Sequence, residues 1–316
     1  MIWLFLLLLA AVAALPFVIE HYRVKMSDGR RGSASGQFAE LSQGVTHYHL
    51  TGPAEGPLVV CIHGLTTPSI VWSPLAKEMV DLGFRVLVYD LYGRGYSDRP
   101  AGTQDKALFN RQLVDLLTHL EIDAPFHLIG HSMGGAIATG FAATYPERVR
   151  RLALLTPAGM ARIDASLIRF IRDRGIIGDW LMLAGYPRQL RNGIRAECEQ
   201  YDVSAQISES QHNQLVFQGF VPAVLSSLRG LLRAPLEGEH MTLHRAKIPV
   251  LALWGGEDTV VSASAMGQLA AWNRDVIHEV VEDAGHGLPY THTKEVLAHL
   301  TAFLPAPEGD DWGHDP

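Results

Sequence analysis

A serine set between glycines, in Gly130-His131-Ser132-Met133-Gly134, is the first candidate for chemistry. The apolar residues 126–129 before it predict a buried strand, and the small residues 135–138 after it predict the start of a helix. A serine on such a sharp turn needs glycines beside it, because side chains would collide in the strained backbone. The turn raises the hydroxyl above the sheet at a helix N-terminus, where negative charge is favoured. We predict that Ser132 is a nucleophile.

His286 is the histidine best placed to be the base that this serine needs, because a hydroxyl attacks well only when a base takes its proton. It lies in a glycine-flanked loop, Asp283-Ala284-Gly285-His286-Gly287, directly after the apolar segment 276–281. Ligands bind where strands end in an open parallel sheet. Of the other histidines, His131 would point beside the serine hydroxyl rather than towards it.

Asp258 is the predicted acid that holds the base in one tautomer and stabilises its protonated form. It follows the apolar segment 249–254, in the loop Gly255-Gly256-Glu257-Asp258. The adjacent Glu257 is the alternative acid. Serine, aspartate and histidine then follow one another along the chain in one of the known orders for such a triad.

The loop His63-Gly64-Leu65 follows the third predicted strand and is the candidate for binding an oxyanion. Its backbone N–H at Leu65 and the backbone N–H of Met133 are the two predicted donors. Loss of one such donor costs roughly 3–4 kcal/mol of transition-state stabilisation. We expect His63 itself to be structural and to hold the loop by hydrogen bonds.

Segments of apolar or alternating residues predict strands, and amphipathic segments between them predict helices. The predicted strands are residues 38–41, 45–50, 58–62, 85–89, 126–129, 151–155, 249–254 and 276–281, and the predicted helices are 73–82, 106–120, 135–145 and 293–304. This alternation predicts an α/β fold with a mostly parallel sheet flanked by helices on both faces.

The alternation stops after residue 159 and resumes at residue 248. Residues 160–247 predict a helical cap inserted between strands six and seven of a core formed by 37–159 and 248–304. Arginines in this segment lie among acidic residues, which predicts a mixed solvated face; contact with acidic lipid headgroups is the alternative. These arginines are Arg162, Arg169, Arg172, Arg174, Arg188, Arg191 and Arg195. Residues 305–316 predict a disordered tail.

Residues 1–19 carry no charged side chain. As a helix they would be about 28 Å long, close to the ~30 Å apolar thickness of a bilayer. The basic residues Arg23, Lys25, Arg30 and Arg31 follow, so the positive-inside tendency places the domain behind them in the cytoplasm. We therefore predict that 1–27 form an uncleaved membrane anchor with its juxtamembrane segment, joined by a linker at 28–36. A signal cleaved on export, or an apolar helix packed on the domain, are the alternatives.

The overall composition excludes some classes of partner and framework. A net charge of -7 and the lack of any Lys/Arg run argue against a nucleic-acid partner. The two cysteines are far apart, and Cys61 lies in the apolar run 58–62, where a free cysteine behaves as a small buried hydrophobe. The sequence therefore does not predict a disulfide framework.

Two pairs of histidines have a spacing that could contribute metal ligands. His47 and His49 share one face of a predicted strand, and His240 and His244 lie one helical turn apart. No cysteine or carboxylate cluster near them in the sequence completes a site, so we expect solvent-facing histidines and no metal.

Five motifs together resemble the α/β-hydrolase superfamily. They are His63-Gly64, Asp90-Leu91-Tyr92-Gly93-Arg94-Gly95-Tyr96-Ser97, Gly130-His131-Ser132-Met133-Gly134-Gly135, Gly255-Gly256-Glu257-Asp258 and Gly285-His286. Within this superfamily the sequence resembles bacterial esterases and monoacylglycerol-lipase-like enzymes, some of which carry an N-terminal anchor. The resemblance also implies a helical cap between strands six and seven. Ser132 distinguishes the chain from the related dehalogenases and epoxide hydrolases, which have an aspartate at this position.

The sequence therefore predicts hydrolysis of carboxylic esters with small-to-medium apolar acyl groups, through an acyl-serine intermediate and without a metal or organic cofactor. The predicted partners are a small ester substrate and a membrane; neither nucleic acid nor an obligate protein partner is indicated. One alternative is a serine-dependent carbon–carbon bond hydrolase of aromatic degradation products. The other is a non-catalytic ligand-binding homologue, which the complete triad disfavours.

Overall fold

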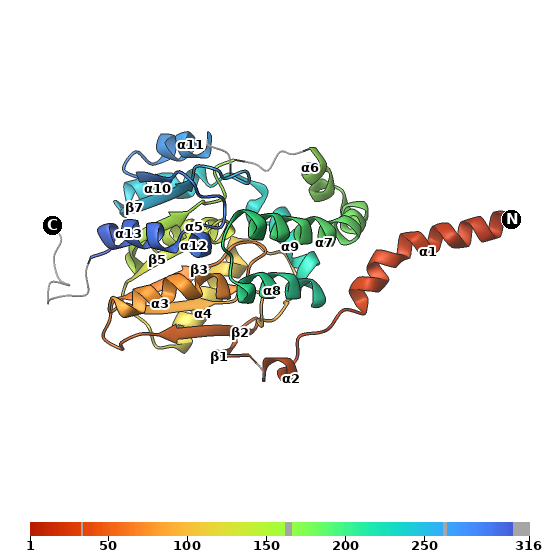
Figure 1. Cartoon of the computed structure of the whole chain (residues 1–316), viewed down its shortest axis with the longest axis horizontal. Helices are drawn as coiled ribbons and strands as arrows, with labels where there is room; N and C mark the ends of the chain where they lie inside the picture. Colours follow the sequence, from red (N-terminus) through yellow and green to blue (C-terminus); the bar gives the residue numbers. More distant parts are fainter. Residues whose placement is uncertain (33, 162–165, 262–263, 306–316) are drawn as a thin grey trace.

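A single eight-stranded sheet forms the centre of the molecule in the computed structural model, which describes residues 1–32, 34–161, 166–261 and 264–305 (Figure 1). Its order is β1-β2-β4-β3-β5-β6-β7-β8; β2 runs antiparallel to both of its neighbours, β1 and β4, and all other neighbouring pairs are parallel. The strands are β1 Gln37–Leu41, β2 Gly44–Thr51, β3 Leu58–Ile62, β4 Arg85–Tyr89, β5 Phe126–His131, β6 Val149–Leu155, β7 Val250–Gly255 and β8 Ile277–Val281. The predicted mostly parallel α/β sheet is confirmed.

Helices cover both faces of this sheet because alternate residues of its inner strands are apolar on both sides. In β3, Val60 packs in the same cluster as the residues of α4 (Lys106–His119) and α5 (Met133–Thr144). Its neighbour Cys61 points to the other face, with residues of α3 (Ser73–Asp81) and α13 (Thr293–Phe303). Cys61 is buried and free, as the sequence predicted.

Five α-helices lie between β6 and β7, so the predicted helical character of 160–247 is confirmed for its described residues. They are α6 Ser166–Asp173, α7 Gly175–Gln200, α8 Ala205–Asn213, α9 Phe220–Arg229 and α10 Glu237–Arg245. The last of them, α10, packs against α5 and against α11 (Ser264–Trp272), a helix that the sequence did not predict. The division of the chain into a core and a cap remains a prediction.

The first helix, α1 (Ile2–His21), projects from the body, and almost all of its side chains are exposed (Figure 1). It is long and apolar enough to cross a membrane, although a signal sequence has the same properties. The body-facing end of α1 contacts α7. Of the predicted tail, only Pro305 lies within the described residues.

The predicted linker, residues 28–36, is attached to the body rather than free. It contains a short helix, α2 (Asp28–Arg31). The buried Arg31 donates from Nε to the Tyr96 carbonyl at 3.1 Å and pairs with the carboxylates of Asp28 and Asp98. Periodicity could not reveal the contacts of Arg31 with Tyr96 and Asp98, because these two residues lie about 65 residues further along the chain.

The prediction of solvent-facing histidines is wrong for His47 and His240. His47 is buried, with Nδ1 2.7 Å from Asp90 Oδ2 and Nε2 2.6 Å from the Ser35 carbonyl. His240 is also buried and stacks on Trp272, with ring centroids 6.0 Å apart. Distant segments cover both side chains, which local spacing does not show. Within the described ranges, no three His, Cys, Asp or Glu side chains are grouped to hold a metal ion.

Candidate active site

Ser132 lies on the turn between β5 and α5, in the middle of the sheet. Its φ is +54° and its ψ is -119°, a conformation that residues with a side chain rarely adopt. The turn is tight: a Cβ added to Gly134 would lie 2.0 Å from the Ile62 carbonyl oxygen. The Ser132 N–H donates to the Leu155 carbonyl at 3.0 Å. The predicted strand–serine–helix turn is therefore present, and α5 begins directly after the serine.

Three predicted residues from distant parts of the chain meet in one hydrogen-bonded row. Ser132 Oγ lies 2.8 Å from Nε2 of His286, and Nδ1 of the same ring lies 2.8 Å from Oδ2 of Asp258. Asp258 follows β7, and His286 follows the neighbouring strand β8. A carboxylate on Nδ1 places the ring proton there and leaves Nε2 free to accept the serine proton. The side chains of Ser132 and His286 are both partly exposed, so a substrate can reach them.

Asp258 is fixed and charged in this arrangement. Its Oδ1 accepts hydrogen bonds from the backbone N–H groups of Val260 at 2.7 Å and Val261 at 3.0 Å. Burial acts to raise the pKa of the Asp258 carboxyl, but the interaction with His286 and these N–H donors outweigh it, so the pKa is lowered.

The alternative acid, Glu257, points to other partners. Its Oε2 accepts from Gln200 Nε2 at 2.9 Å and from the Tyr201 hydroxyl at 3.3 Å. Both residues lie at the carboxyl end of α7, which therefore touches the loop that carries Asp258. The geometry favours Asp258 over Glu257 as the partner of His286.

The backbone of His286 is held by two neighbours that the sequence did not assign to this task. The carbonyl oxygen of His286 lies 2.8 Å from His131 Nε2 and accepts from the Thr156 hydroxyl at 3.2 Å. Burial lowers the pKa of His131 to about 3, so its ring is neutral at ordinary pH. As predicted, His131 lies beside Ser132 and forms no hydrogen bond with its hydroxyl within the described residues.

His63 holds the candidate oxyanion loop, as predicted. Its Nδ1 donates to the Gly64 carbonyl at 2.9 Å, and its Nε2 accepts from the Leu91 N–H at 2.9 Å. Burial lowers the pKa of His63 to about 4, which is consistent with a neutral ring that donates at one nitrogen and accepts at the other. A Cβ added to Gly64 would lie 3.3 Å from Ser132 Cβ, so this loop passes directly over the serine.

Arg94 is a residue of the site that sequence reasoning missed, although it lies within a quoted motif. Its side chain is fully buried, and Nε donates to the Leu65 carbonyl at 3.0 Å. The remaining donors reach the Tyr92 carbonyl at 3.0 Å, the Ser227 hydroxyl at 2.8 Å and the side chain of Gln104. Burial lowers the pKa of Arg94 to about 9, so it is charged at neutral pH. One buried cation thus joins the Leu65 loop to α9.

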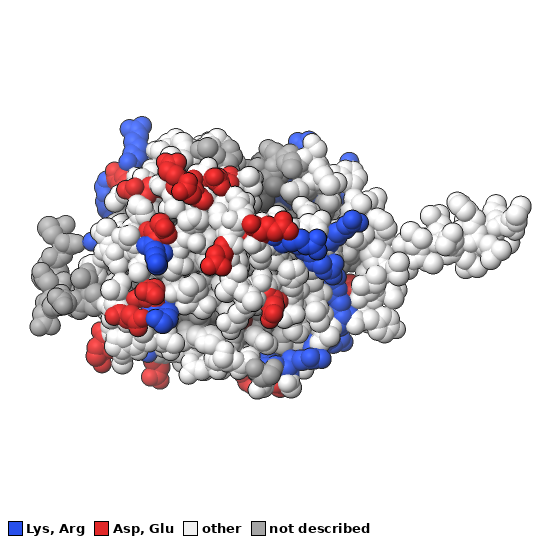
Figure 2. All heavy atoms as spheres, in the orientation of Figure 1, with Lys and Arg blue, Asp and Glu red and all other residues white. Residues whose placement is uncertain are grey.

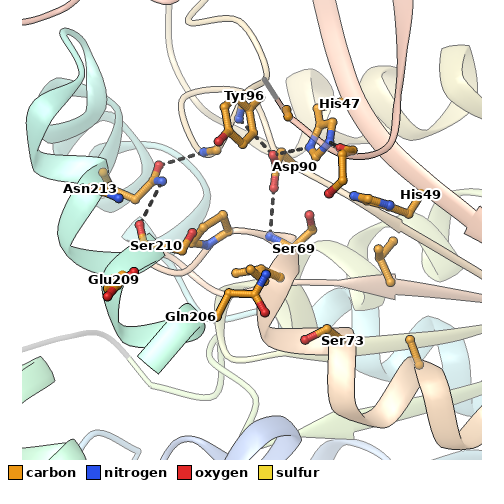
Figure 3. A pocket seen from close by; sticks show the side chains of 18 of the residues that line it. His47, His49, Ser69, Ser73, Asp90, Tyr96, Gln206, Glu209, Ser210 and Asn213 are labelled. Carbon is orange, nitrogen blue, oxygen red and sulfur yellow. Dashed lines mark hydrogen bonds and ion pairs between the residues drawn. The ribbon is translucent and has the colours of Figure 1, made fainter. Parts of the chain in front are cut away.

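The loop that begins at His63 is also fixed at its other end, beside a cavity of about 940 Å³ (Figure 3). Figure 3 shows Asp90 between His47 and Ser69; Asp90 Oδ1 accepts from the Ser69 N–H at 2.8 Å. The walls of this cavity are β2, α3, α8 and the segment after α1, and none of the triad residues lines it. Asp90 therefore supports the candidate oxyanion loop from a cavity that Ser132 does not line.

Comparison with known proteins agrees with this geometry. The sequence pattern of the alpha/beta hydrolase fold family matches residues 57–293. A monoacylglycerol lipase of Xenopus laevis is 24% identical over 274 residues, which cover 82% of this chain and 78% of that protein. The 2-hydroxy-6-oxo-6-phenylhexa-2,4-dienoate hydrolase of Comamonas testosteroni is 30% identical over 226 residues, which cover 58% of this chain and 78% of that protein.

The fold is also similar to that of solved structures. One, described as a membrane phospholipase A, aligns with a TM-score of 0.70 and 23% identity, and the alignment covers 96% of each chain. At this level of identity the likeness concerns the fold, and the chemistry must be argued from the residues of the site.

Proposed function

The chain belongs to the alpha/beta hydrolase family, and from this premise we propose that it is a serine hydrolase of carboxylic esters. The observation that carries the proposal is the row of two 2.8 Å contacts from Ser132 Oγ through His286 to Asp258. Such a row makes a nucleophile and a base available on the same side of a bound carbonyl. Relatives named as lipases fit the proposal.

In the proposed mechanism, Ser132 Oγ attacks the ester carbonyl carbon while His286 Nε2 takes the hydroxyl proton. Asp258 holds the ring and stabilises the imidazolium that forms. In the tetrahedral intermediate, His286 then gives this proton to the alkoxy oxygen of the ester, and the bond between that oxygen and the carbonyl carbon breaks. The alcohol departs, and the acyl group remains bound to Ser132. A water molecule then attacks the acyl carbon while His286 takes its proton. His286 returns this proton to Ser132 Oγ as the carboxylic acid is released.

The negative oxygen of the intermediate is stabilised by the backbone N–H groups of Leu65 and Met133. Met133 is the first residue of α5, where N–H groups lack a partner within the helix. Leu65 follows Gly64, which lies against Ser132, and its own carbonyl is fixed by Arg94. Donors that are fixed before the reaction stabilise the charge without reorganisation.

We further propose that α1 is an uncleaved membrane anchor and that the hydrolase domain lies in the cytoplasm, with residues 160–247 as its cap. The helix has 20 residues, about 30 Å, and its exposed residues Trp3 and Tyr22 stand near its two ends. Aromatic residues are enriched at both membrane interfaces. Export after cleavage of α1 is the alternative. N-terminal sequencing separates the two, and extraction by salt alone would contradict an anchor.

A second candidate reaction is hydrolysis of a carbon–carbon bond in an aromatic degradation product. The Comamonas testosteroni relative, which is named for this activity, favours it. A purified sample given a 2-hydroxy-6-oxo-dienoate and an ester in parallel distinguishes the two reactions by their relative kcat/KM.

The direct test is hydrolysis of p-nitrophenyl esters with two to sixteen acyl carbons by the full chain and by Ser132→Ala. We expect turnover by the wild type and a loss of roughly a thousandfold or more in kcat for the variant. The preferred chain length then measures the acyl pocket. If neither protein hydrolyses any ester, the esterase proposal is wrong.

A further inference from the structure

The junction between α6 and α7 exposes large apolar side chains that have no partner in the core. Leu167, Phe170, Ile176 and Ile177 are 64%, 44%, 73% and 57% exposed. We call these four residues the α6–α7 patch. Single exposed leucines are ordinary, but four large exposed apolar side chains on two helices that contact each other indicate an interaction surface.

The patch is presented by a fixed turn. Arg229 of α9 donates from Nε to the Arg172 carbonyl at 3.0 Å and from Nη2 to the carbonyls of Ile171 and Gly175 at 3.3 and 3.1 Å. The same guanidinium pairs with Asp179. Because one side chain binds the end of α6 and the start of α7, the four apolar residues keep their positions relative to the body.

Positive charge extends from this patch along α7. Arg188, Arg191 and Arg195 are exposed and follow one another at helical spacing, so they form a stripe on one face. Within the described ranges, none of the three is part of an ion pair. Figure 2 shows Lys and Arg side chains gathered on the side of the body from which α1 projects.

Three of the acidic neighbours that predicted a mixed face bind other side chains. Asp173 pairs with Arg172, Asp179 pairs with Arg229, and Glu197 accepts a hydrogen bond from the Tyr290 hydroxyl at 2.9 Å. Glu199 is exposed and lies one helical turn after Arg195, so the mixed solvated face stays a prediction for the end of α7. Two members of that predicted face, Arg162 and Asp164, lie outside the described residues.

The patch and the arginine stripe share the side of the molecule that carries α1. The body-facing end of α1 packs against α7, and the charges of Arg23 and Arg191 are near enough to interact. Figure 1 shows α1 leaving the body on the side where α6 and α7 meet. A bilayer crossed by α1 would therefore face the patch and the stripe.

We propose that the α6–α7 patch and the arginines of α7 rest on the surface of an anionic bilayer, with the patch inserted among the headgroups. The proposal depends on the anchor proposed above, because α1 defines which surface faces the bilayer. Apolar side chains beside basic ones fit this partner, since the first bury apolar area in the interface and the second attract anionic lipid. The hydrolase domain would then contact the membrane through the α6–α7 patch and the arginines of α7 as well as through α1.

The test uses the full chain in nanodiscs of phosphatidylcholine and phosphatidylglycerol, with an environment-sensitive fluorophore on one cysteine. Cys198 is exposed and is replaced by serine, whereas the buried Cys61 is kept. The reporter position is Ile177→Cys. Leu9→Cys in α1 is the control for the anchor, and Ala302→Cys on α13 is the control for a surface away from the bilayer.

We expect blue-shifted emission at positions 9 and 177, quenching of both by nitroxide lipids, and water-like emission at position 302. Water-like emission at 177 with a membrane signal at 9 would overturn the docking proposal and leave the anchor intact. Water-like emission at 9 removes the anchor and the docking with it. A blue shift at 177 that nitroxide lipids do not quench would assign the patch to a protein contact, such as a second copy, and would also overturn the proposal. The p-nitrophenyl ester assay tests the catalytic proposal separately.

The charge requirement is tested with Arg188→Gln, Arg191→Gln and Arg195→Gln. Each basic residue near an anionic surface strengthens binding by about fivefold. Each replacement should therefore lower the equilibrium constant for docking, measured by the fluorophore at position 177, by about that factor. The matched control replaces the exposed Arg111, Arg245 and Arg274 of other elements in the same way. An equal loss in both triple variants, or no loss in either, would contradict a role for the stripe.

Discussion

Ser132 owes its position to a backbone that the rest of the molecule must hold in place. A residue with a side chain at φ +54° costs on the order of 1–3 kcal/mol. The turn is held on both sides, because the Ser132 N–H binds the Leu155 carbonyl and the Ser132 carbonyl accepts from the N–H groups of Gly135 and Ala158. Thr156, directly after β6, also has a positive φ (+43°), and the conformation of Ser132 aims its hydroxyl at His286.

At the same scale, the two adjacent carboxylates of the β7 loop should differ sharply in their effect on catalysis. Asp258→Asn should lower kcat by about 10⁴-fold, because an amide allows the wrong tautomer of His286 and removes the charge that stabilises imidazolium. Glu257→Gln is the matched control and should change kcat little, since Glu257 bonds Gln200 and Tyr201 instead. Steady-state kinetics on one soluble ester checks both; a larger loss in Glu257→Gln would reverse the assignment.

Arg94 should act on the transition state by fixing Leu65, because the carbonyl that it binds lies in the peptide directly after the one that carries the Leu65 N–H. An oxyanion donor is worth about 10²–10³ in kcat. Arg94→Met frees the Leu65 carbonyl and displaces this donor rather than removing it, so we expect kcat to fall by roughly 10–100-fold with KM nearly unchanged. Ser227→Ala is the control, because it removes one Arg94 contact on α9 and keeps the bond to Leu65.

Arg94→Met and Ser227→Ala are compared at a temperature where circular dichroism shows both folded. A rise in KM without a change in kcat would mean that Arg94 shapes the binding pocket and does not position the oxyanion loop.

At the scale of elements, two glycine-to-alanine changes in helices should have opposite effects. Gly134 lies in the first turn of α5, where a Cβ would meet the Ile62 carbonyl at 2.0 Å, so Gly134→Ala must shift the turn that carries Ser132. Gly193 lies inside α7, where a Cβ meets nothing within 4 Å. Gly193→Ala should stabilise the protein by about 1 kcal/mol through helix propensity.

Thermal unfolding and ester hydrolysis, measured on the same samples, check this pair. Gly134→Ala should lose both stability and activity, and Gly193→Ala should gain stability and keep its activity. Retention of full activity in Gly134→Ala would show that the elbow tolerates a side chain that the geometry excludes.

The helix α7 connects the proposed membrane face with the active site. It contacts α1 at one side. At its carboxyl end, Gln200 and Tyr201 bond Glu257, next to Asp258, and Glu197 bonds Tyr290, four residues after His286. A single element of 26 residues thus contacts α1 and lies against residues close in sequence to Asp258 and His286.

At the scale of the whole molecule, burial of neutral histidines should make the fold sensitive to acid. Burial lowers the pKa of His63, His127 and His240 to about 4 and that of His131 to about 3. The unfolded chain takes up these protons below about pH 6.5, whereas the folded chain does not until about pH 4. Stability is therefore complete above pH 6.5 and falls as the pH drops towards 4, by about 1.4 kcal/mol per pH unit for each histidine.

Urea unfolding of the detergent-solubilised chain between pH 7.5 and pH 4.5 measures this slope. His240→Phe is the informative variant, because neither ring nitrogen of His240 has a hydrogen-bond partner among the described residues and the residue lies outside the triad. It should reduce the slope by about one proton. An unchanged slope would mean that His240 is protonated in the fold at the same pH as in the unfolded chain.

The sequence by itself determined the order of the strands and which polar residues stand at the ends of four of them. Apolar runs with period two and helices between them predict a parallel sheet, and such a sheet brings its carboxyl ends to one edge. This is why Ser132, Asp258 and His286 could be assigned from loops that are up to 154 residues apart. A glycine-flanked turn needs no distant information, since its strain is local.

Only the tertiary structure decided what covers these elements and what joins them. Arg94, His47 and Arg31 are polar residues that local spacing would place in solvent, yet each is buried against oxygens from distant segments. Three acidic neighbours of the α7 arginines show the opposite case: Asp173, Asp179 and Glu197 are near them in sequence but bind other side chains. Periodicity reports which face of an element is apolar, whereas hydrogen bonds and ion pairs depend on which segments meet in space, and that is fixed only when the whole chain packs.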